Sequence, residues 1–60
     1  MDNKTIRRLF LTYCDNHNNP SMAQIAKSMG ISYYSLLKWR NDKHDYSEKS
    51  LEKVLTFISK

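Results

Sequence analysis

The sequence has very little of several residue types: it contains one cysteine, one glycine and one proline among 60 residues. A single cysteine cannot close an internal disulfide, so packing or a partner must stabilise the fold, and the chain suits a reducing compartment. No apolar run approaches the roughly 18 residues of a membrane span, and no secretory h-region follows the charged start of the chain. We therefore expect a cytoplasmic protein that does not contact membranes.

The chain also lacks the residue patterns of catalytic and metal sites. Sixty residues allow one small domain, 1–60. The only soft metal ligands are Cys14, His17 and His44, whose spacing is unlike that of a zinc site, and Cys14 is most simply a packing residue. No nucleophile with a base in helical register, no paired carboxylates and no glycine-rich phosphate loop occur. We expect no enzymatic activity, metal, cofactor or small-molecule ligand.

Apolar residues recur at helical spacing in four segments, and no segment shows the alternation of a strand. The pattern predicts an all-α class and a compact four-helix domain, with helices at about 3–15, 21–29, 32–41 and 48–58. The expected N-caps are Asp2 or Asn3, then Ser21, Ser32 and Ser47. The expected core consists of Ile6, Leu9, Phe10, Tyr13, Ile25, Ala26, Met29, Ile31, Leu36, Trp39, Leu51, Val54, Leu55 and Ile58.

The second and third predicted helices are joined by a short turn around Gly30. Glycine suits a left-handed residue after a helix because it has no Cβ. Counted from Met22, an apolar residue falls at the fourth position, a small one at the fifth and glycine at the ninth, and apolar residues follow at the tenth, fifteenth and eighteenth. This spacing predicts a central helix-turn-helix rather than a generic four-helix bundle, and the second helix of such a motif can enter the DNA major groove.

Positive charge is concentrated in the same part of the chain. Of the net charge of +4, +3 lies within residues 21–44. The contributing residues are Lys27, Lys38, Arg40 and Lys43 against Asp42. An anionic partner for this segment follows from the charge. Arg7 and Arg8, outside the segment, are expected to be solvated.

The stretch 21–32, Ser-Met-Ala-Gln-Ile-Ala-Lys-Ser-Met-Gly-Ile-Ser, resembles the phage repressor and Cro family of helix-turn-helix DNA-binding domains, also called XRE-type or lambda-repressor-like. Residues 39–43 are similar to the aromatic-Glu-Asn-Gly-Lys pattern of that family, and 47–58 to its next core helix. The chain departs from the family at Met22, Arg40 and Asp42, where glutamine, an acid and glycine are common. No segment of these 60 residues matches the fifth helix of the family, which often builds the dimer.

The resemblance implies a sequence-specific double-stranded DNA-binding protein, a small repressor-like transcriptional regulator of phage, plasmid or mobile-element origin, with helix 32–41 in the major groove. Base contacts are then expected from Tyr33, Tyr34, Leu37 and Lys38. Helical geometry places the last three on the outer face and Tyr33 at its boundary, near the helix start. Phosphate contacts are expected from the backbone amides at the start of the second helix, at Met22 and Ala23, and from Ser35, Asn41 and Lys43.

Phe57 lies about 110° from the centre of the last apolar stripe at 100° per residue. It either covers the rim of the first helix or meets its symmetry mate, in a weak homodimer formed on a palindromic operator.

The alternative function is a helix-turn-helix protein-interaction module, or a phage-encoded inhibitor of a host protein, that binds through Tyr33, Tyr34 and Leu37. The local positive charge favours nucleic acid, and the apolar residues on the same face favour protein.

Overall fold

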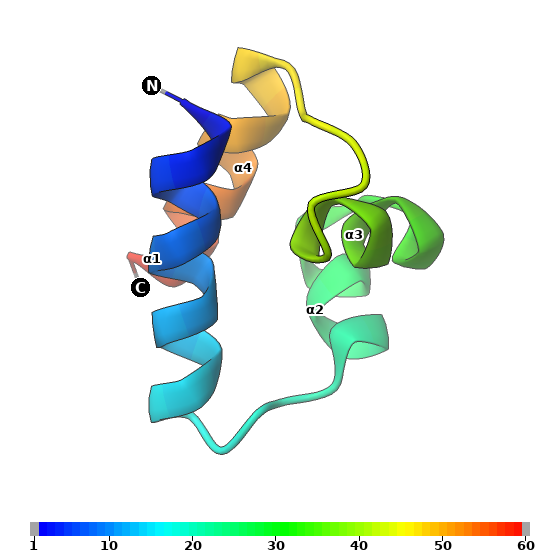
Figure 1. Cartoon of the computed structure of the whole chain (residues 1–60). Coiled ribbons are helices and arrows are strands. Elements are labelled where there is room, and N and C mark those ends of the chain that lie inside the picture. The colour runs from blue at the N-terminus through cyan, green and yellow to red at the C-terminus, as the bar shows by residue number, and fades with distance from the viewer. Residues whose placement is uncertain (1, 60) are drawn as a thin grey trace.

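The computed structural model describes residues 2–59, which form four helices. They are α1 (Asn3–Asn16), α2 (Met22–Met29), α3 (Tyr33–Arg40) and α4 (Glu48–Ile58). α1 and α4 pack side by side, and α2 and α3 form a second pair that packs against them (Figure 1). No strand occurs within 2–59, so the predicted all-α class and four helices are confirmed, with each end within one residue. None of these helices combines the length and apolar character that crossing a membrane requires.

Each helix begins at a side chain that accepts a backbone amide hydrogen bond. Ser21, Ser32 and Ser47 accept from the amides three residues on, at 3.4, 3.3 and 3.4 Å, as the sequence predicted. In α1 the cap is Asp2 rather than Asn3, since Asp2 Oδ1 accepts from the Thr5 amide at 2.6 Å. This hydrogen bond holds the pKa of the Asp2 carboxyl below its usual value.

α2 ends in a left-handed residue, Gly30, with φ 70° and ψ 33°. The Gly30 amide donates to Lys27 O at 3.2 Å, and the Ile31 amide donates to Ala26 O at 3.0 Å. This pair of hydrogen bonds is the Schellman ending, which satisfies carbonyls that the helix leaves free. The predicted turn between α2 and α3 is therefore present, and three residues, 30–32, separate the two helices.

We expect Gly30→Ala to lower the free energy of unfolding by about 1 kcal/mol or more. A Cβ at Gly30 would meet no heavy atom within 4 Å, so the loss arises from the positive φ and not from a clash. Urea unfolding followed by circular dichroism measures the change. Gly30→Asn is the control and should lose less, because asparagine visits this conformation more readily. An unchanged unfolding midpoint in Gly30→Ala would contradict the assigned turn.

α3 has the same kind of ending, but its left-handed residue is Asp42, with φ 62°. The Asp42 amide donates to Trp39 O at 3.1 Å, and the Lys43 amide donates to Lys38 O at 2.7 Å. Aspartate adopts this conformation less readily than glycine. The residue that replaces the glycine of the resembled pattern therefore still takes a glycine-like backbone.

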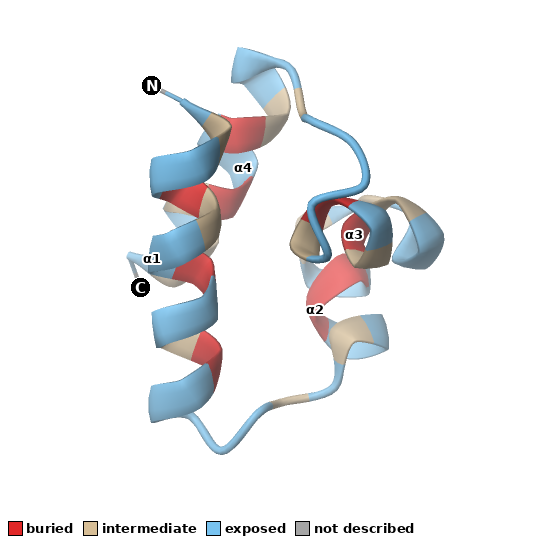
Figure 2. Cartoon of the chain, viewed as in Figure 1, coloured by how far each residue is buried: buried red, intermediate tan, exposed pale blue. Residues whose placement is uncertain are grey.

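The core lies between the two helix pairs (Figure 2). Its buried residues are Ile6, Phe10, Cys14, Ile25, Ala26, Leu36, Trp39, Leu51 and Val54. Most of the other predicted core residues are half-buried and pack against this cluster: Tyr13, Met29, Ile31, Leu55 and Ile58. The predicted packing role of Cys14 is confirmed, and burial raises the pKa of its thiol.

The prediction that Leu9 belongs to the core is wrong, because its side chain is 45% exposed. The buried face of α1 follows Ile6, Phe10 and Cys14, which are spaced by four residues. At 100° per residue each such step rotates the face by about 40°, away from the side of Leu9. α1 therefore presents a narrower face to the core than its apolar residues suggest.

Candidate nucleic-acid interface

The outer face of α3 carries the residues predicted to read bases. Tyr34 is 74% exposed, Tyr33 is 43% exposed, and Lys38 is exposed as well. The two tyrosine rings lie together, with centroids 5.7 Å apart. Leu37 is half-buried, so it lies at the edge of this face rather than at its centre. The face offers two phenol rings and one ammonium group to a partner.

An open hollow of about 730 Å³ separates this face from the loop between α3 and α4. The hollow is lined by Ser32, Tyr34, Ser35, Lys38, Lys43 and His44. The ammonium groups of Lys38 and Lys43 and the hydroxyls of Ser32 and Tyr34 can donate hydrogen bonds to an anion, and a phosphate is the anion that such groups contact on DNA. The structure thus brings predicted base contacts and predicted phosphate contacts to one place.

Ser32 and His44 were missed as members of this hollow. His44 reaches it because the loop folds back along α3, which places its Nε2 3.1 Å from Ser35 O and 3.5 Å from Ser35 Oγ. Ser35, a predicted phosphate contact, is half-buried, and its hydroxyl donates to Tyr46 Oη at 2.9 Å. Burial raises the pKa of the Tyr46 phenol. The only sequence signal that His44 belongs to this hollow is its position next to Lys43, a predicted phosphate contact.

Two further predicted phosphate contacts lie at the start of α2. Ala23 is exposed, whereas Met22 is half-buried and its side chain packs against the core. The first amides of any helix have no carbonyl partner within it, and the helix dipole favours an anion there. A phosphate could therefore meet the backbone at this end of α2, and the Met22 side chain has a packing role.

Asn41, the remaining predicted phosphate contact, is exposed directly after α3. The backbone amide of Asn41 donates to Leu37 O at 3.0 Å, so the side chain is the part of Asn41 that remains available for a phosphate. Arg40, next to it, is half-buried, and its Nε is buried without a hydrogen-bond partner among residues 2–59. The positive charge counted in the sequence is therefore not all on one face: Lys38 and Lys43 line the hollow, and Arg40 is turned toward the protein.

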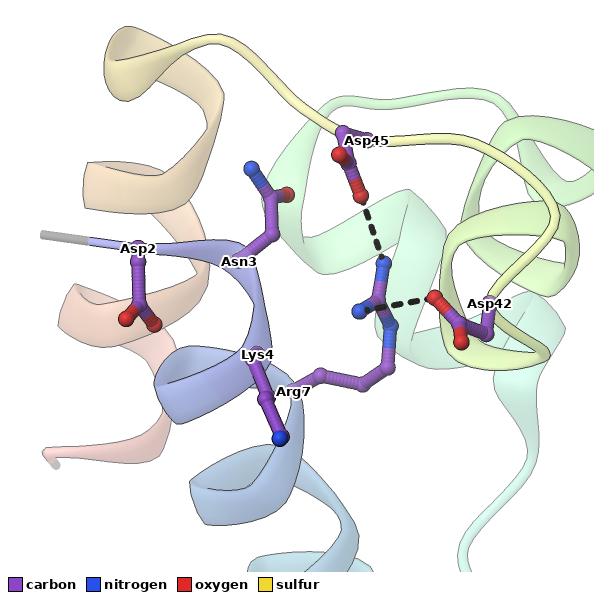
Figure 3. A pocket seen from close by; sticks show the side chains of 6 residues that line it. All are labelled: Asp2, Asn3, Lys4, Arg7, Asp42 and Asp45. Carbon is purple, nitrogen blue, oxygen red and sulfur yellow. Dashed lines mark hydrogen bonds and ion pairs between the residues drawn. The ribbon is translucent and has the colours of Figure 1, made fainter.

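The prediction that Arg7 is solvated is wrong. Only 11% of its side chain is exposed, and the guanidinium connects α1 to the α3–α4 loop (Figure 3). Nε donates to Trp39 O at 2.6 Å, and Nη2 donates to His44 O at 3.2 Å. Nη1 and Nη2 form ion pairs of 3.1 Å with Asp42 and Asp45. The two acids three residues apart in the loop were the sequence signal for a cationic partner.

Asn3, one turn before Arg7 on α1, also connects α1 to α3 and to the α3–α4 loop. Asn3 Oδ1 accepts from Trp39 Nε1 and from the Tyr46 amide, both at 2.8 Å, and Asn3 Nδ2 donates to Tyr46 O at 3.1 Å. The Arg7 guanidinium lies over the Trp39 ring at 5.2 Å, and the Tyr46 ring stacks on Trp39 at 5.3 Å. The path of the loop is therefore fixed from α1 on one side and from α3 on the other.

Phe57 is half-buried and its ring meets Tyr13 edge-on, with centroids 5.3 Å apart. The Tyr13 ring also stacks with the His17 ring, with centroids 4.1 Å apart. Phe57 thus covers the rim of α1, which is one of its two expected uses, and a contact with a second copy stays a prediction. Across residues 2–59 no three His, Cys, Asp or Glu side chains gather where they could hold a metal ion.

Comparison of the chain with protein-family models, with curated proteins and with solved structures gives no match. The geometry of the helix-turn-helix and its neighbouring hollow is therefore the basis for assigning a function.

Proposed function

We propose that the protein binds double-stranded DNA sequence-specifically and acts as a small repressor-like transcriptional regulator of phage, plasmid or mobile-element origin. The observation that carries the proposal is the outer face of α3, with exposed Tyr33, Tyr34 and Lys38 beside the hollow that contains Lys43. α3 follows the Gly30 turn, and it thus occupies the position of the second helix of a helix-turn-helix motif, which is the helix that enters the major groove. The resemblance to the phage repressor and Cro family supports the same function.

In this arrangement α3 lies in the major groove and the surrounding backbone groups meet phosphates. Lys38 can donate to guanine O6 or N7, the tyrosine hydroxyls can reach base edges, and Leu37 can touch a thymine methyl from the edge of the face. Lys43, Asn41 and the start of α2 supply phosphate contacts, which fix the register of the protein on the duplex. Occupying an operator in this way would block transcription.

The proposal is tested by selecting ligands from a pool of random-sequence duplexes and sequencing those retained. We expect one enriched motif, and an affinity that falls linearly with salt on logarithmic axes, because bound phosphates release counterions. Retention without any sequence preference would reduce the function to charge attraction. Absence of binding to every duplex would contradict the proposal.

A protein-interaction module is the second candidate, and the exposed pair Tyr33 and Tyr34 favours it. Exposed tyrosines are enriched in protein interfaces, where they supply large contact areas with a polar end. Such a module includes the case of a phage-encoded inhibitor that binds a host protein. It would lack both the salt dependence and the enriched motif of the selection experiment.

We expect two copies to bind a palindromic operator as a weak homodimer, with Phe57 at the contact. The measurement is sedimentation of the free protein and of its complex with a duplex carrying two half-sites about one DNA turn apart. The wild type should be largely monomeric alone and paired on DNA, and Phe57→Ser should bind one half-site but lose the pairing. Phe57→Leu, which keeps an apolar side chain against Tyr13, controls for lost packing. A tight dimer that persists in Phe57→Ser would reject this contact.

A further inference from the structure

The α3–α4 loop carries charges of both signs within four residues, and the fold separates them. Lys43 and His44 line the hollow beside α3. Asp42 and Asp45 line a different open hollow, of about 670 Å³, beside the start of α1 (Figure 3). Neither acid borders the first hollow and neither base borders the second. One short loop therefore presents a basic side toward α3 and an acidic side toward α1.

Arg7 is the residue that holds the two carboxylates in place. Its Nη atoms lie 3.1 Å from one Oδ of Asp42 and 3.1 Å from one Oδ of Asp45. Both acidic side chains are largely exposed, at 80% and 71%, and exposed ion pairs contribute little to folding stability. The main effect of these ion pairs is therefore on the position of the two carboxylates, which they hold beside the start of α1.

We infer that Arg7 is a positioning residue of the proposed DNA interface, because it keeps the carboxylates of Asp42 and Asp45 on the α1 side of the loop. This inference rests on the proposed function. Without Arg7 the two carboxylates, which flank Lys43 and His44 in the sequence, lose the ion pairs that hold them on the α1 side. They can then pair with Lys43 or approach the DNA phosphate, and like charges close together oppose binding. Arg7 thereby acts on DNA affinity without touching DNA.

The test compares four proteins on a random-sequence duplex at about 0.15 M salt, where charges beyond roughly 8 Å are screened. They are the wild type, Arg7→Met, the double variant Asp42→Asn with Asp45→Asn, and the combination of all three. Methionine retains an apolar stem against Trp39 and removes the charge. Arg8→Met is the matched control, because Arg8 is exposed on the same helix. Binding is measured at a temperature where circular dichroism shows each variant folded.

We expect Arg7→Met to weaken binding about tenfold, and the combined variant to return to within about threefold of the wild type. The double variant alone should change binding less than about threefold, because its carboxylates already lie on the far side. Arg8→Met should change it less than about twofold, since it removes only one solvated charge. Recovery in the combined variant is the decisive result, because a lost direct contact or a damaged fold would not be restored by neutralising the two acids.

Two outcomes would overturn the inference while the proposed function stands: wild-type affinity in Arg7→Met, or a combined variant that stays as weak as Arg7→Met. A wild type that binds no duplex would remove the proposed function and the inference together. If Arg7→Met does not fold, Arg7→Lys replaces it, since lysine keeps the charge but cannot span both acids. It should weaken binding by a smaller factor and show the same recovery, and absence of recovery would overturn the inference.

Discussion

Trp39→Ala is expected to leave most of the chain unfolded at 25 °C. The Trp39 side chain is fully buried, meets Phe10 edge-on at 5.5 Å and stacks on Tyr46. Its indole N–H also donates to Asn3, and Arg7 lies over its ring. Truncating a buried tryptophan costs about 3–5 kcal/mol, and a chain of this length has a total stability of about 3–9 kcal/mol. The free energy lost in Trp39→Ala is therefore comparable to the total free energy of unfolding of the protein.

Urea unfolding followed by far-ultraviolet circular dichroism measures this loss. Tyr34→Ala is the matched control, because it removes an aromatic residue from the same helix at a position that is 74% exposed. It should change the free energy of unfolding by less than about 0.5 kcal/mol. Trp39→Phe should fall between the two, because it keeps a ring and loses the N–H. A wild-type midpoint for Trp39→Ala would contradict the core described above.

Lys38→Ala and Lys43→Ala are expected to weaken DNA binding in different ways. Lys43 follows α3 and is proposed to meet phosphate, so its loss should weaken all duplexes about equally and reduce the salt slope by about one unit. Lys38 is proposed to read a base from α3, so its loss should cost about 1–3 kcal/mol on the preferred sequence and less on random DNA. Sequence reading and charge attraction are thereby separated.

Titrations at several salt concentrations, on the preferred duplex and on a random one, decide between these outcomes. Lys53→Ala is the control, because Lys53 is exposed on α4 and lines a hollow between α2 and α4 instead. Equal weakening of both duplexes by both variants would mean that Lys38 shares the phosphate of Lys43 and reads no base. Unchanged DNA binding together with loss of a protein partner would favour the interaction module.

The sequence by itself determined the helices and most of their ends, because the signals for both are local. Serine caps at Ser21, Ser32 and Ser47 act on amides three residues away, and Gly30 takes its left-handed backbone for want of a Cβ. Apolar spacing found the buried residues of α2, α3 and α4 in the same way. Apolar spacing wrongly placed Leu9 in the core. Periodicity gives the direction of the apolar face of a helix, but not how much of that face the neighbouring helices cover.

The tertiary structure alone decided how the α3–α4 loop is used. In the sequence two acids, Asp42 and Asp45, flank two adjacent bases, Lys43 and His44, without any sign of which side each will take. Their sorting depends on Arg7, which is more than thirty residues away along the chain, and on Asn3 beside it on α1. Hydrogen bonds and ion pairs of that range exist only after α1 has packed against α3, and no local pattern encodes them. The same packing explains why His44 joins Lys38 and Lys43 in one hollow.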